Sequence, residues 1–308
     1  TDDIKDQVLI KSDGSPAYNF ACVVDDSFMG ISHILRGDDH ISNTPKQILF
    51  YEAFGLRPPE FGHMPLILGP DGSKLSKRHG GVSVEEYKRE GFLPQALANY
   101  LFLLGWSPGG EREVLSLDEA VKIFEVAAMN AVQAKFDLHK LRWFNAEYIM
   151  KTDGNVLVPL VRNQLLEAGV DLAGRDDAYI GRVLGLYRVR VKTLREFPAQ
   201  TECFFRDDFP VEDGGRALLD DPENRELMAG LVPRLERLDP FGHEAVEALF
   251  REAAAERGVK PARLIHPVRM AVSGLSKGAG LFEMMEVLGK ETVLRRLRRA
   301  VHGSVEQA

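Results

Sequence analysis

The amino-terminal part of the chain alternates short apolar runs with polar turn signals, and each run predicts a strand. Asp13-Gly14 lies between the first two runs and predicts a hairpin turn. Asn43–Leu56 differs, because its apolar residues have helical spacing and Gly55 offers a stop. A helix between strands indicates part of a parallel α/β sheet. The predicted strands lie within Val8–Ile10, Ala17–Val24, Asp25–Gly37 and His63–Leu68.

The rest of the chain has the pattern of helices joined by short loops. Ser83 with Glu86, and Ser116 with Glu119, have the spacing of capping boxes, and Pro94 stands where a first-turn proline is tolerated. The predicted fold class is therefore α/β followed by all-α. Helical periodicity continues through 156–170, 178–197, 243–258 and 280–300.

The composition is that of an ordinary globular protein. The 308 residues are 44% hydrophobic and 28% charged, which suffices for the cores of two or three domains. The net charge of −7 argues against a protein that coats nucleic acid indiscriminately. No run approaches the roughly 18 apolar residues of a membrane helix, and no secretory signal is visible, so we expect a cytoplasmic protein without membrane contact. Because the chain starts with Thr1 and a strand pattern follows at once, we interpret it as a piece of something longer.

Four residues are expected in the interior. Cys22 and Cys203 lie in apolar or aromatic runs and form neither a disulfide framework nor a cysteine-rich zinc site, so we expect two buried thiols. Trp106 and Trp143 are expected in the core as well.

The stretch GPDGSKLSKRHG at Gly69–Gly80 places Lys74, Lys77 and Arg78 around the hydroxyl of Ser76. A lysine run beside glycine is ordinarily a solvated turn, and composition alone favours that interpretation. The run follows a predicted strand, however, and α/β folds bind ligands at the carboxyl ends of parallel strands. Two ammonium groups in a glycine-flanked loop can surround an anion with several oxygens. With a triphosphate, they would stabilise the charge that develops on the leaving pyrophosphate.

KLSKR at Lys74–Arg78 resembles the Lys-Met-Ser-Lys-Ser-type signature of class I aminoacyl-tRNA synthetases, in the form typical of bacterial glutamyl-tRNA synthetases. Further stretches match in the right order, so the resemblance covers essentially the whole chain. It implies the second half of a Rossmann-like nucleotide-binding domain at 1–80, a helical stem-contact region at 81–150 and an all-helical anticodon-binding region at 151–308. The matching stretches are DGSPAYNFACVVDD, ILRGDDHISNTPKQ, HMPLILGPDGSKLSKRHG, EGFLPQALANYLFLLGWS, FDLHKLRWFN, HPVRMAVSG and GLFEMMEVLGKE.

The resemblance implies ATP-dependent attachment of glutamate to tRNA(Glu) through glutamyl-adenylate, which is the reaction of a ligase. The implied substrates are ATP with Mg²⁺, L-glutamate and tRNA(Glu), and we expect a monomer. No His-x-Gly-His pattern occurs in the 308 residues, so half of the family's ATP site is missing and we expect the isolated chain to be inactive. The family's zinc site belongs to an insert that precedes this segment, so no zinc is expected here.

The resemblance also implies site residues for ATP. Lys74, Ser76 and Lys77 would be catalytic, and Asp39 and His40 would join the two lysines in binding ATP. Without the resemblance, His40 could equally be a hydrogen-bonding residue near a helix, with no ligand.

Glutamate would be bound by Tyr18 and Arg36. A guanidinium pairs bidentately with a carboxylate, and a pocket built around it rejects neutral isosteres. The residues alone leave other interpretations open. The hydroxyl of Tyr18 could be satisfied locally on a strand, and Arg36 could pair with Asp38 or Asp39.

In the helical half, Arg190 matches a position that reads the last anticodon base, and arginine there is typical of enzymes that charge tRNA for glutamate but not for glutamine. Arg188, Lys192 and Arg195 would form a basic stripe on one predicted helix and complete the tRNA-binding candidates. A solvated face is the alternative for such a stripe. The run RRLRRA near the end fits a helix carboxyl terminus better than RNA.

Two other functions stay open on the sequence. One is a tRNA-binding fragment or paralogue without catalysis. The other is a non-discriminating glutamyl-tRNA synthetase that also charges tRNA(Gln). A glutaminyl-tRNA synthetase is disfavoured, because the anticodon region of that family is built from β-barrels and this one has helical periodicity.

Overall fold

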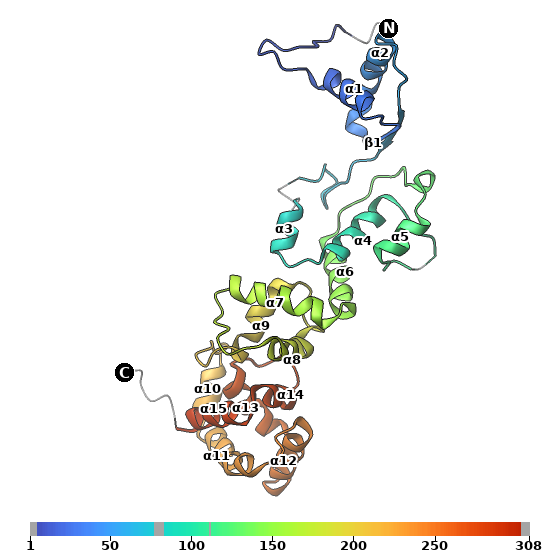
Figure 1. Cartoon of the computed structure of the whole chain (residues 1–308). Helices are drawn as coiled ribbons and strands as arrows, with labels where there is room; N and C mark the ends of the chain where they lie inside the picture. The colour runs from blue at the N-terminus through green and yellow to red at the C-terminus, as the bar shows by residue number, and fades with distance from the viewer. Residues whose placement is uncertain (1–4, 77–82, 111, 303–308) are drawn as a thin grey trace. The chain divides into compact units, whose positions relative to one another are not determined.

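The computed structural model describes residues 5–76, 83–110 and 112–302. The chain divides into two compact units. Figure 1 shows the helices and strands of the chain in sequence order, from blue to red. The first unit consists of Thr1–Glu86 and Pro94–Leu141, and the second of Tyr87–Leu93 and Arg142–Ala308. The segment 87–93 thus belongs to the second unit, although stretches of the first flank it in the sequence. The finer boundaries after residues 80 and 150 stay predictions.

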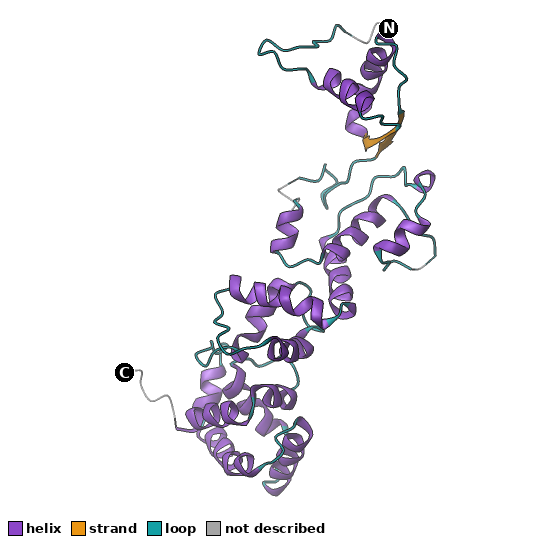
Figure 2. Cartoon of the chain, viewed as in Figure 1, coloured by secondary structure: helices purple, strands orange, loops and turns teal. Residues whose placement is uncertain are grey.

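The described part of the first unit combines a small parallel sheet with helices, and that of the second consists of helices and loops (Figure 2). The elements of the first unit are α1 (Tyr18–Phe28), β1 (His33–Gly37), η1 (Asp38–Asn43), α2 (Thr44–Ala53), β2 (Glu60–Met64), α4 (Pro94–Gly105), α5 (Leu117–Ile123) and η3 (Val126–Ala128). Helices α3 (Val84–Arg89) and α6 (Leu138–Lys151) contain residues of both units. The elements of the second unit are α7 (Gly154–Glu167), α8 (Asp177–Tyr187), η4 (Leu194–Glu196), α9 (Phe197–Thr201), η5 (Glu202–Phe204), α10 (Gly215–Asp220), α11 (Pro222–Arg237), α12 (His243–Glu256), α13 (Ala262–Ser273), α14 (Leu281–Leu288) and α15 (Lys290–His302).

Strands β1 and β2 pair in parallel, and α2 lies between them in the sequence. Their register places Arg36 opposite His63, so both residues lie near the carboxyl ends of their strands. Helix α2 ends at Ala53 because Gly55 takes a φ of +65°, which side chains other than glycine rarely adopt. The predicted helix between parallel strands is confirmed, and with it the α/β class of this part.

The strand predicted at Ala17–Val24 is wrong, because Tyr18–Phe28 forms helix α1. The ring of Phe20 packs against the rings of Phe50 and Phe54, at centroid distances of 6.4 and 6.0 Å. A short apolar run does not distinguish a strand from a buried helix, and here packing against α2 decides.

The hairpin turn predicted at Asp13-Gly14 is confirmed. An antiparallel bridge joins Ile10 and Pro16, and the Lys11 N–H donates to the Ser15 carbonyl at 2.8 Å. The flanking runs form this single bridge and no longer strand in the described residues.

Both predicted capping boxes are present. The Ser83 N–H donates to the Glu86 carboxylate and the Glu86 N–H to the Ser83 hydroxyl, at 3.3 and 3.2 Å. The corresponding bonds of Ser116 and Glu119 are 2.9 and 3.2 Å long. Pro94 opens α4 as predicted.

One helix was predicted over 178–197, and this prediction is wrong. Helix α8 ends at Tyr187, and the chain turns before η4 and α9. Val191 and Leu194 are nevertheless buried. The apolar residues of this stretch therefore face the interior from a chain that bends, not from one face of a single helix. The largest fully buried side chains of the second unit include Tyr187, Phe144, Phe197, Phe204, Phe250, Ile149, Leu157, Leu165 and Ile180.

The interior expectations are partly wrong. Trp106 is 4% exposed and Cys203 2%, as expected, and burial raises the pKa of the Cys203 thiol to about 12. Cys22 is only half-buried, and Trp143 is 45% exposed. Its neighbour Phe144, whose ring centroid lies 5.0 Å from that of Trp143, takes the core position on α6. Among the described residues, no helix has both the length and the apolar character needed to cross a bilayer.

Arg296 of α15 is buried in the second unit, with 3% of its surface exposed. Its guanidinium donates to the carbonyls of Val272, Cys203 and Arg206, at 2.6, 2.7 and 3.0 Å. Asp207 accepts a further hydrogen bond of 3.0 Å. Burial lowers the pKa of Arg296, and the hydrogen bond to Asp207 opposes that shift. This arginine of the RRLRRA run therefore binds carbonyls outside its own helix.

We expect Arg296→Lys to lower the free energy of unfolding by about 2 kcal/mol or more, because a single ammonium nitrogen cannot reach all the acceptors that the three guanidinium nitrogens reach, and buried acceptors lose their donors. Urea denaturation followed by circular dichroism measures the loss. Arg298→Lys is the control on the same helix, since the Arg298 side chain pairs with Glu236 at the surface. Equal losses in the two variants would contradict the buried role of Arg296.

Candidate functional site

Arg36 lies near the carboxyl end of β1 and is half-buried. Its Nη2 donates to the Thr44 hydroxyl at 2.7 Å, its Nε lies 3.4 Å from His63 Nε2, and its guanidinium lies 5.3 Å from the Phe61 ring centroid. Among the described residues, no carboxylate lies within ion-pair distance of this guanidinium. Pairing with Asp38 or Asp39 is therefore not what the structure shows. The guanidinium keeps donors available for a planar anion.

Tyr18 lies beside Arg36, and His40 lies beside Tyr18. Tyr18 is the first residue of α1, and its ring centroid lies 5.9 Å from that of His40 in η1. Burial and a hydrogen bond with Cys22 raise the pKa of the Tyr18 hydroxyl, while the positive charge of Arg36 opposes the shift. The structure thus brings Tyr18, Arg36 and His40 together at one end of the sheet.

The lysine loop folds back on the segment that follows β2. Leu68 and Lys74 form an antiparallel bridge, and the Leu75 N–H donates to the Ile67 carbonyl at 3.0 Å. The Asp71 carboxylate accepts bonds from the Ser73 N–H and hydroxyl, at 2.9 and 2.7 Å. This tight turn gives the loop a defined path up to residue 76.

Within this loop, the ammonium of Lys74 lies 2.9 Å from Asp39 Oδ2. Their hydrogen bond lowers the pKa of Asp39, although both side chains are well exposed. Asp39 lies two residues after the end of β1, the strand that carries Arg36, so the loop and the Arg36 cluster adjoin. Ser76 is half-buried, whereas Lys77 and Arg78 lie outside the described residues.

The basic stripe predicted for Arg188, Lys192 and Arg195 does not lie on one helix, because α8 ends at Tyr187. Arg188 points its Nη2 to the carbonyls of Ile149, Met150 and Thr152 at the end of α6. Arg195 pairs with Glu90 at 2.7 Å. The remaining two, Arg190 and Lys192, are exposed.

Several contacts of the site were not foreseen from the sequence. Thr44, Phe61 and His63 had no assigned role, yet they surround the Arg36 guanidinium. A signal existed for His63, because a parallel pairing of the two strand runs places it beside the Arg36 strand. Among the described residues, no group of three or more His, Cys, Asp or Glu side chains is arranged to hold a metal ion.

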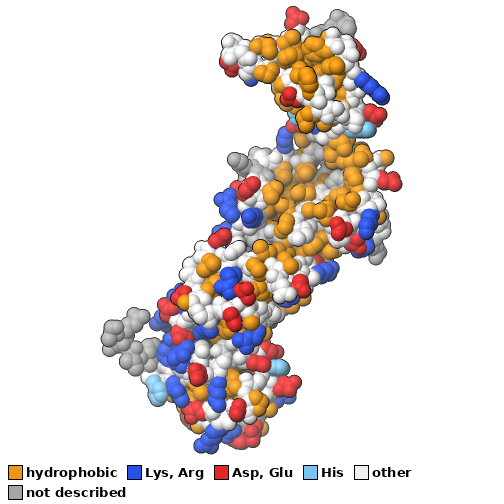
Figure 3. Space-filling model, viewed as in Figure 1, with side chains coloured by type: hydrophobic (Ala, Val, Ile, Leu, Met, Phe, Trp, Pro, Cys, Tyr) orange, Lys and Arg blue, Asp and Glu red, His pale blue; other side chains and the backbone are white. Residues whose placement is uncertain are grey.

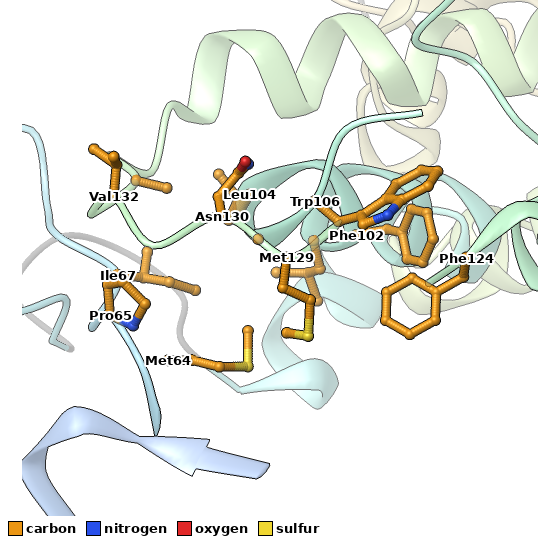
Figure 4. Close-up of a pocket in the computed structure, with 13 residues that line it drawn as sticks. Met64, Pro65, Ile67, Phe102, Leu104, Trp106, Phe124, Met129, Asn130 and Val132 are labelled. Atoms are coloured by element: carbon orange, nitrogen blue, oxygen red, sulfur yellow. The ribbon is translucent and has the colours of Figure 1, made fainter. Parts of the chain in front are cut away.

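A separate pocket of the first unit has a different chemistry. It has a volume of about 290 Å³ and lies between the segment after β2, helix α4 and the loop around Met129. The close-up shows Trp106, Phe102 and Phe124 together at one end and Met64, Pro65 and Ile67 at the other (Figure 4). Its lining is apolar apart from the Asn130 amide and the indole N–H of Trp106, and it carries no charged side chain to pair with a phosphate or a carboxylate. Other apolar side chains gather on the visible surface of the first unit (Figure 3). Phe28, a residue of the first unit, is 90% exposed.

Comparison with known proteins gives two family matches. Residues 1–143 match the model described as "tRNA synthetases class I (E and Q), catalytic domain". Residues 156–301 match the model described as "Anticodon binding domain".

Curated relatives cover nearly the whole chain. Glutamate–tRNA ligase 2 of Caldicellulosiruptor saccharolyticus is 43% identical over 97% of this chain and 62% of its own length. Glutamate–tRNA ligase of Aquifex aeolicus is 43% identical over 98% of this chain and 64% of its own length. The chain therefore spans a little under two thirds of these relatives.

Solved structures agree with this likeness. The crystal structure of a glutamate tRNA ligase from Elizabethkingia meningosepticum in complex with its amino acid matches with a TM-score of 0.85 at 30% identity, over 98% of this chain and 63% of that one. The glutamate-tRNA synthetase of Elizabethkingia anophelis matches with a TM-score of 0.82 at 29% identity, over the same shares.

We expect Lys74→Met to raise the pKa of Asp39, because the hydrogen bond from Lys74 is the main cause of its depression. With Lys74 present, the Asp39 carboxylate stays ionised to lower pH, so the ion pair is intact at neutral pH and is lost as the pH falls through the Asp39 pKa. An NMR titration of the carboxyl carbons measures both states. Asp13 is the internal control, since Ser15 depresses its pKa. A pKa of Asp39 that does not move would contradict the pairing.

Proposed function

The chain belongs to the glutamate–tRNA ligase family of class I aminoacyl-tRNA synthetases, and we propose that it contributes part of the site where such an enzyme activates glutamate with ATP and attaches it to tRNA(Glu). The identity to curated ligases over nearly all of this chain supports the assignment. Because the chain spans less than two thirds of those relatives, the complete reaction is proposed for the longer enzyme. We expect this chain alone to be inactive, since the 308 residues contain no His-x-Gly-His pattern.

The surroundings of Arg36 carry the proposal. A half-buried guanidinium that bonds to Thr44 and His63, and has no acidic partner among the described residues, is poised to take a carboxylate. Bidentate pairing would select the glutamate side chain over the amide of glutamine, which presents only one oxygen. Tyr18 would border the amino acid on the other side.

The lysine loop would hold the ATP phosphates. Lys74 and Lys77 would face the phosphate oxygens with Ser76, and Asp39 and His40 would border the nucleotide. An oxygen of the glutamate α-carboxylate would attack the α-phosphorus of ATP and form a bond to it. The bond from the α-phosphorus to the oxygen that bridges to the β-phosphate would break and release pyrophosphate. The lysines would stabilise the charge that develops on that leaving group. Mg²⁺ would arrive with ATP as part of the substrate.

The second unit would bind the tRNA. We assign Arg190 to the last anticodon base and Arg188, Lys192 and Arg195 to the segment around it. The described bonds of Arg188 and the ion pair of Arg195 suggest that these two shape the segment, while Arg190 and Lys192 are exposed to the solvent. On the sequence grounds above, we place the enzyme in the cytoplasm as a monomer.

A second candidate is a tRNA-binding module without catalysis. The absence of a His-x-Gly-His pattern from the 308 residues favours it. One reaction distinguishes the two candidates. Only the first predicts that a longer enzyme, which includes this chain and has the full length of the relatives, forms glutamyl-tRNA.

We expect Arg36→Lys in that full-length enzyme to lower kcat/KM for glutamate by roughly 10²- to 10³-fold, because lysine loses the bidentate geometry. The KM for ATP should stay unchanged. Aminoacylation with varied glutamate and ATP measures both. Arg57→Lys, an exposed arginine ahead of β2, is the control. A rise of the two KM values by the same factor would argue against a glutamate contact.

We expect this chain to bind transcribed tRNA(Glu) more tightly than an anticodon-swapped transcript, and Arg190→Gln to reduce the difference by about tenfold. Raising the salt concentration should weaken both complexes, because phosphate contacts release counterions. Filter binding at two salt concentrations measures these effects. Lys260→Gln, which changes an exposed lysine far from Arg190 in the sequence, is the control. Equal binding of both transcripts by the unaltered chain would leave only a charge effect.

A further inference from the structure

The segment 188–196, which we call the basic segment, carries all four of the proposed tRNA-binding residues. It follows α8 and includes η4, and most of its length has no regular secondary structure. Its backbone therefore cannot be held by a helix of its own. The structure shows instead that neighbouring elements of the second unit attach it at both ends.

The first attachment is Arg188. Its Nη2 donates to the carbonyls of Ile149 and Thr152, at 2.6 and 3.0 Å, and also to that of Met150. These carbonyls lie at the end of α6, where helical carbonyls lack partners and a cation is favourable. The start of the basic segment is thereby tied to α6.

The second attachment is Asn145, which lies on α6 and is 0% exposed. Its Nδ2 donates to the Lys192 carbonyl at 2.7 Å and, at 3.4 Å, to the Gly91 carbonyl. Its Oδ1 accepts from the Leu93 N–H at 2.7 Å. One buried amide thus joins two segments that lie far apart in the sequence, and its loss would take this partner from the Leu93 N–H and the Lys192 carbonyl.

The segment 90–93 completes the attachment. The Leu194 N–H donates to the Gly91 carbonyl at 3.0 Å, and Arg195 pairs with Glu90 at 2.7 Å. Gly91 has a φ of +79°, and a Cβ there would lie 2.4 Å from the Arg195 nitrogen. The two backbones touch so closely that only glycine fits.

Glu196 adds a contact from the far end of the basic segment. Its carboxylate accepts from the Lys192 N–H at 2.9 Å and pairs with Arg142 of α6. Both the N–H and the carbonyl of Lys192 are therefore bound by side chains, one from Glu196 and one from Asn145. Between the two attachments lie Val189, 63% exposed, the exposed Arg190 and the buried Val191.

We propose that Asn145 is a positioning residue for tRNA recognition: by fixing the Lys192 backbone on α6, it sets the direction in which Arg190 and Lys192 meet the tRNA. This inference rests on the proposed function, which assigns those two residues to tRNA. Asn145 itself is buried and does not touch the tRNA. Without the bond from Asn145, the segment keeps its charges, but the Arg190 and Lys192 side chains adopt a wider range of orientations. Selection of the anticodon base is therefore reduced, while the general attraction to phosphates remains.

The experiment compares Asn145→Ser with Asn99→Ser in the whole chain. Asn99 is a matched control in the first unit: it is 6% exposed, its Nδ2 donates to the Glu113 carbonyl at 3.0 Å, and its Oδ1 accepts from the Leu115 N–H at 2.9 Å. Dissociation constants are measured for transcribed tRNA(Glu) and for its anticodon-swapped form, and thermal unfolding is followed for each variant. We expect Asn145→Ser to reduce the ratio of the two constants by about tenfold and to change binding of the swapped transcript less than about twofold. Asn99→Ser should leave the ratio unchanged.

Glu196→Ala is the second variant, because it frees the Lys192 N–H without touching the buried amide. We expect Glu196→Ala to reduce the ratio of the two dissociation constants as well, but by a smaller factor. If Asn145→Ser does not fold, the result for Glu196→Ala tests the proposal. Folded variants that select like the unaltered chain would overturn the proposal, as would an equal loss in Asn99→Ser. If the unaltered chain does not distinguish the transcripts, the assigned tRNA role fails, and the positioning role fails with it.

Discussion

The buried amide of Asn145 holds together parts of the second unit that no regular element joins. It bonds to backbone groups of Gly91, Leu93 and Lys192 from one helix position, in a site with no access to water. An amide suits this task because it offers donors and an acceptor without a charge, so burial costs little once each bond is made. A carboxylate or an alkyl chain there would leave backbone groups without partners.

In the first unit, the strand register has the corresponding role. Parallel pairing sets Arg36 opposite His63, and the turn into η1 places Asp39 just beyond it. The lysine loop returns along Ile67 and Leu68 and brings Lys74 to Asp39. Arg36, which has no acidic partner among the described residues, thus adjoins Lys74, which pairs with the exposed Asp39. Both lie at the carboxyl ends of the strands, the edge at which α/β folds bind ligands.

Some arginines of the second unit bond to backbone carbonyls, whereas Arg190 is exposed to the solvent. Arg296 and Arg188 donate to backbone carbonyls of neighbouring elements. Each therefore acts as a structural cross-link, because a guanidinium can reach several carbonyls at once. Arg190 remains exposed on the segment that Arg188 and Asn145 hold. The same residue type thus serves both the framework and the proposed recognition surface.

The sequence by itself determined the helix between parallel strands, both capping boxes and the resemblance to the family, because these depend on local spacing and on motifs several residues long. Tertiary structure decided the rest. The run at Ala17–Val24 became a helix through packing on α2, and the predicted helix over 178–197 was interrupted where Arg188 bonds to the end of α6. The partners of Arg36 and the bonds of Asn145 join residues far apart in the chain, and local patterns carry no information on which distant groups meet. Only the folded arrangement could therefore show which charges are bound within the protein and which stay exposed.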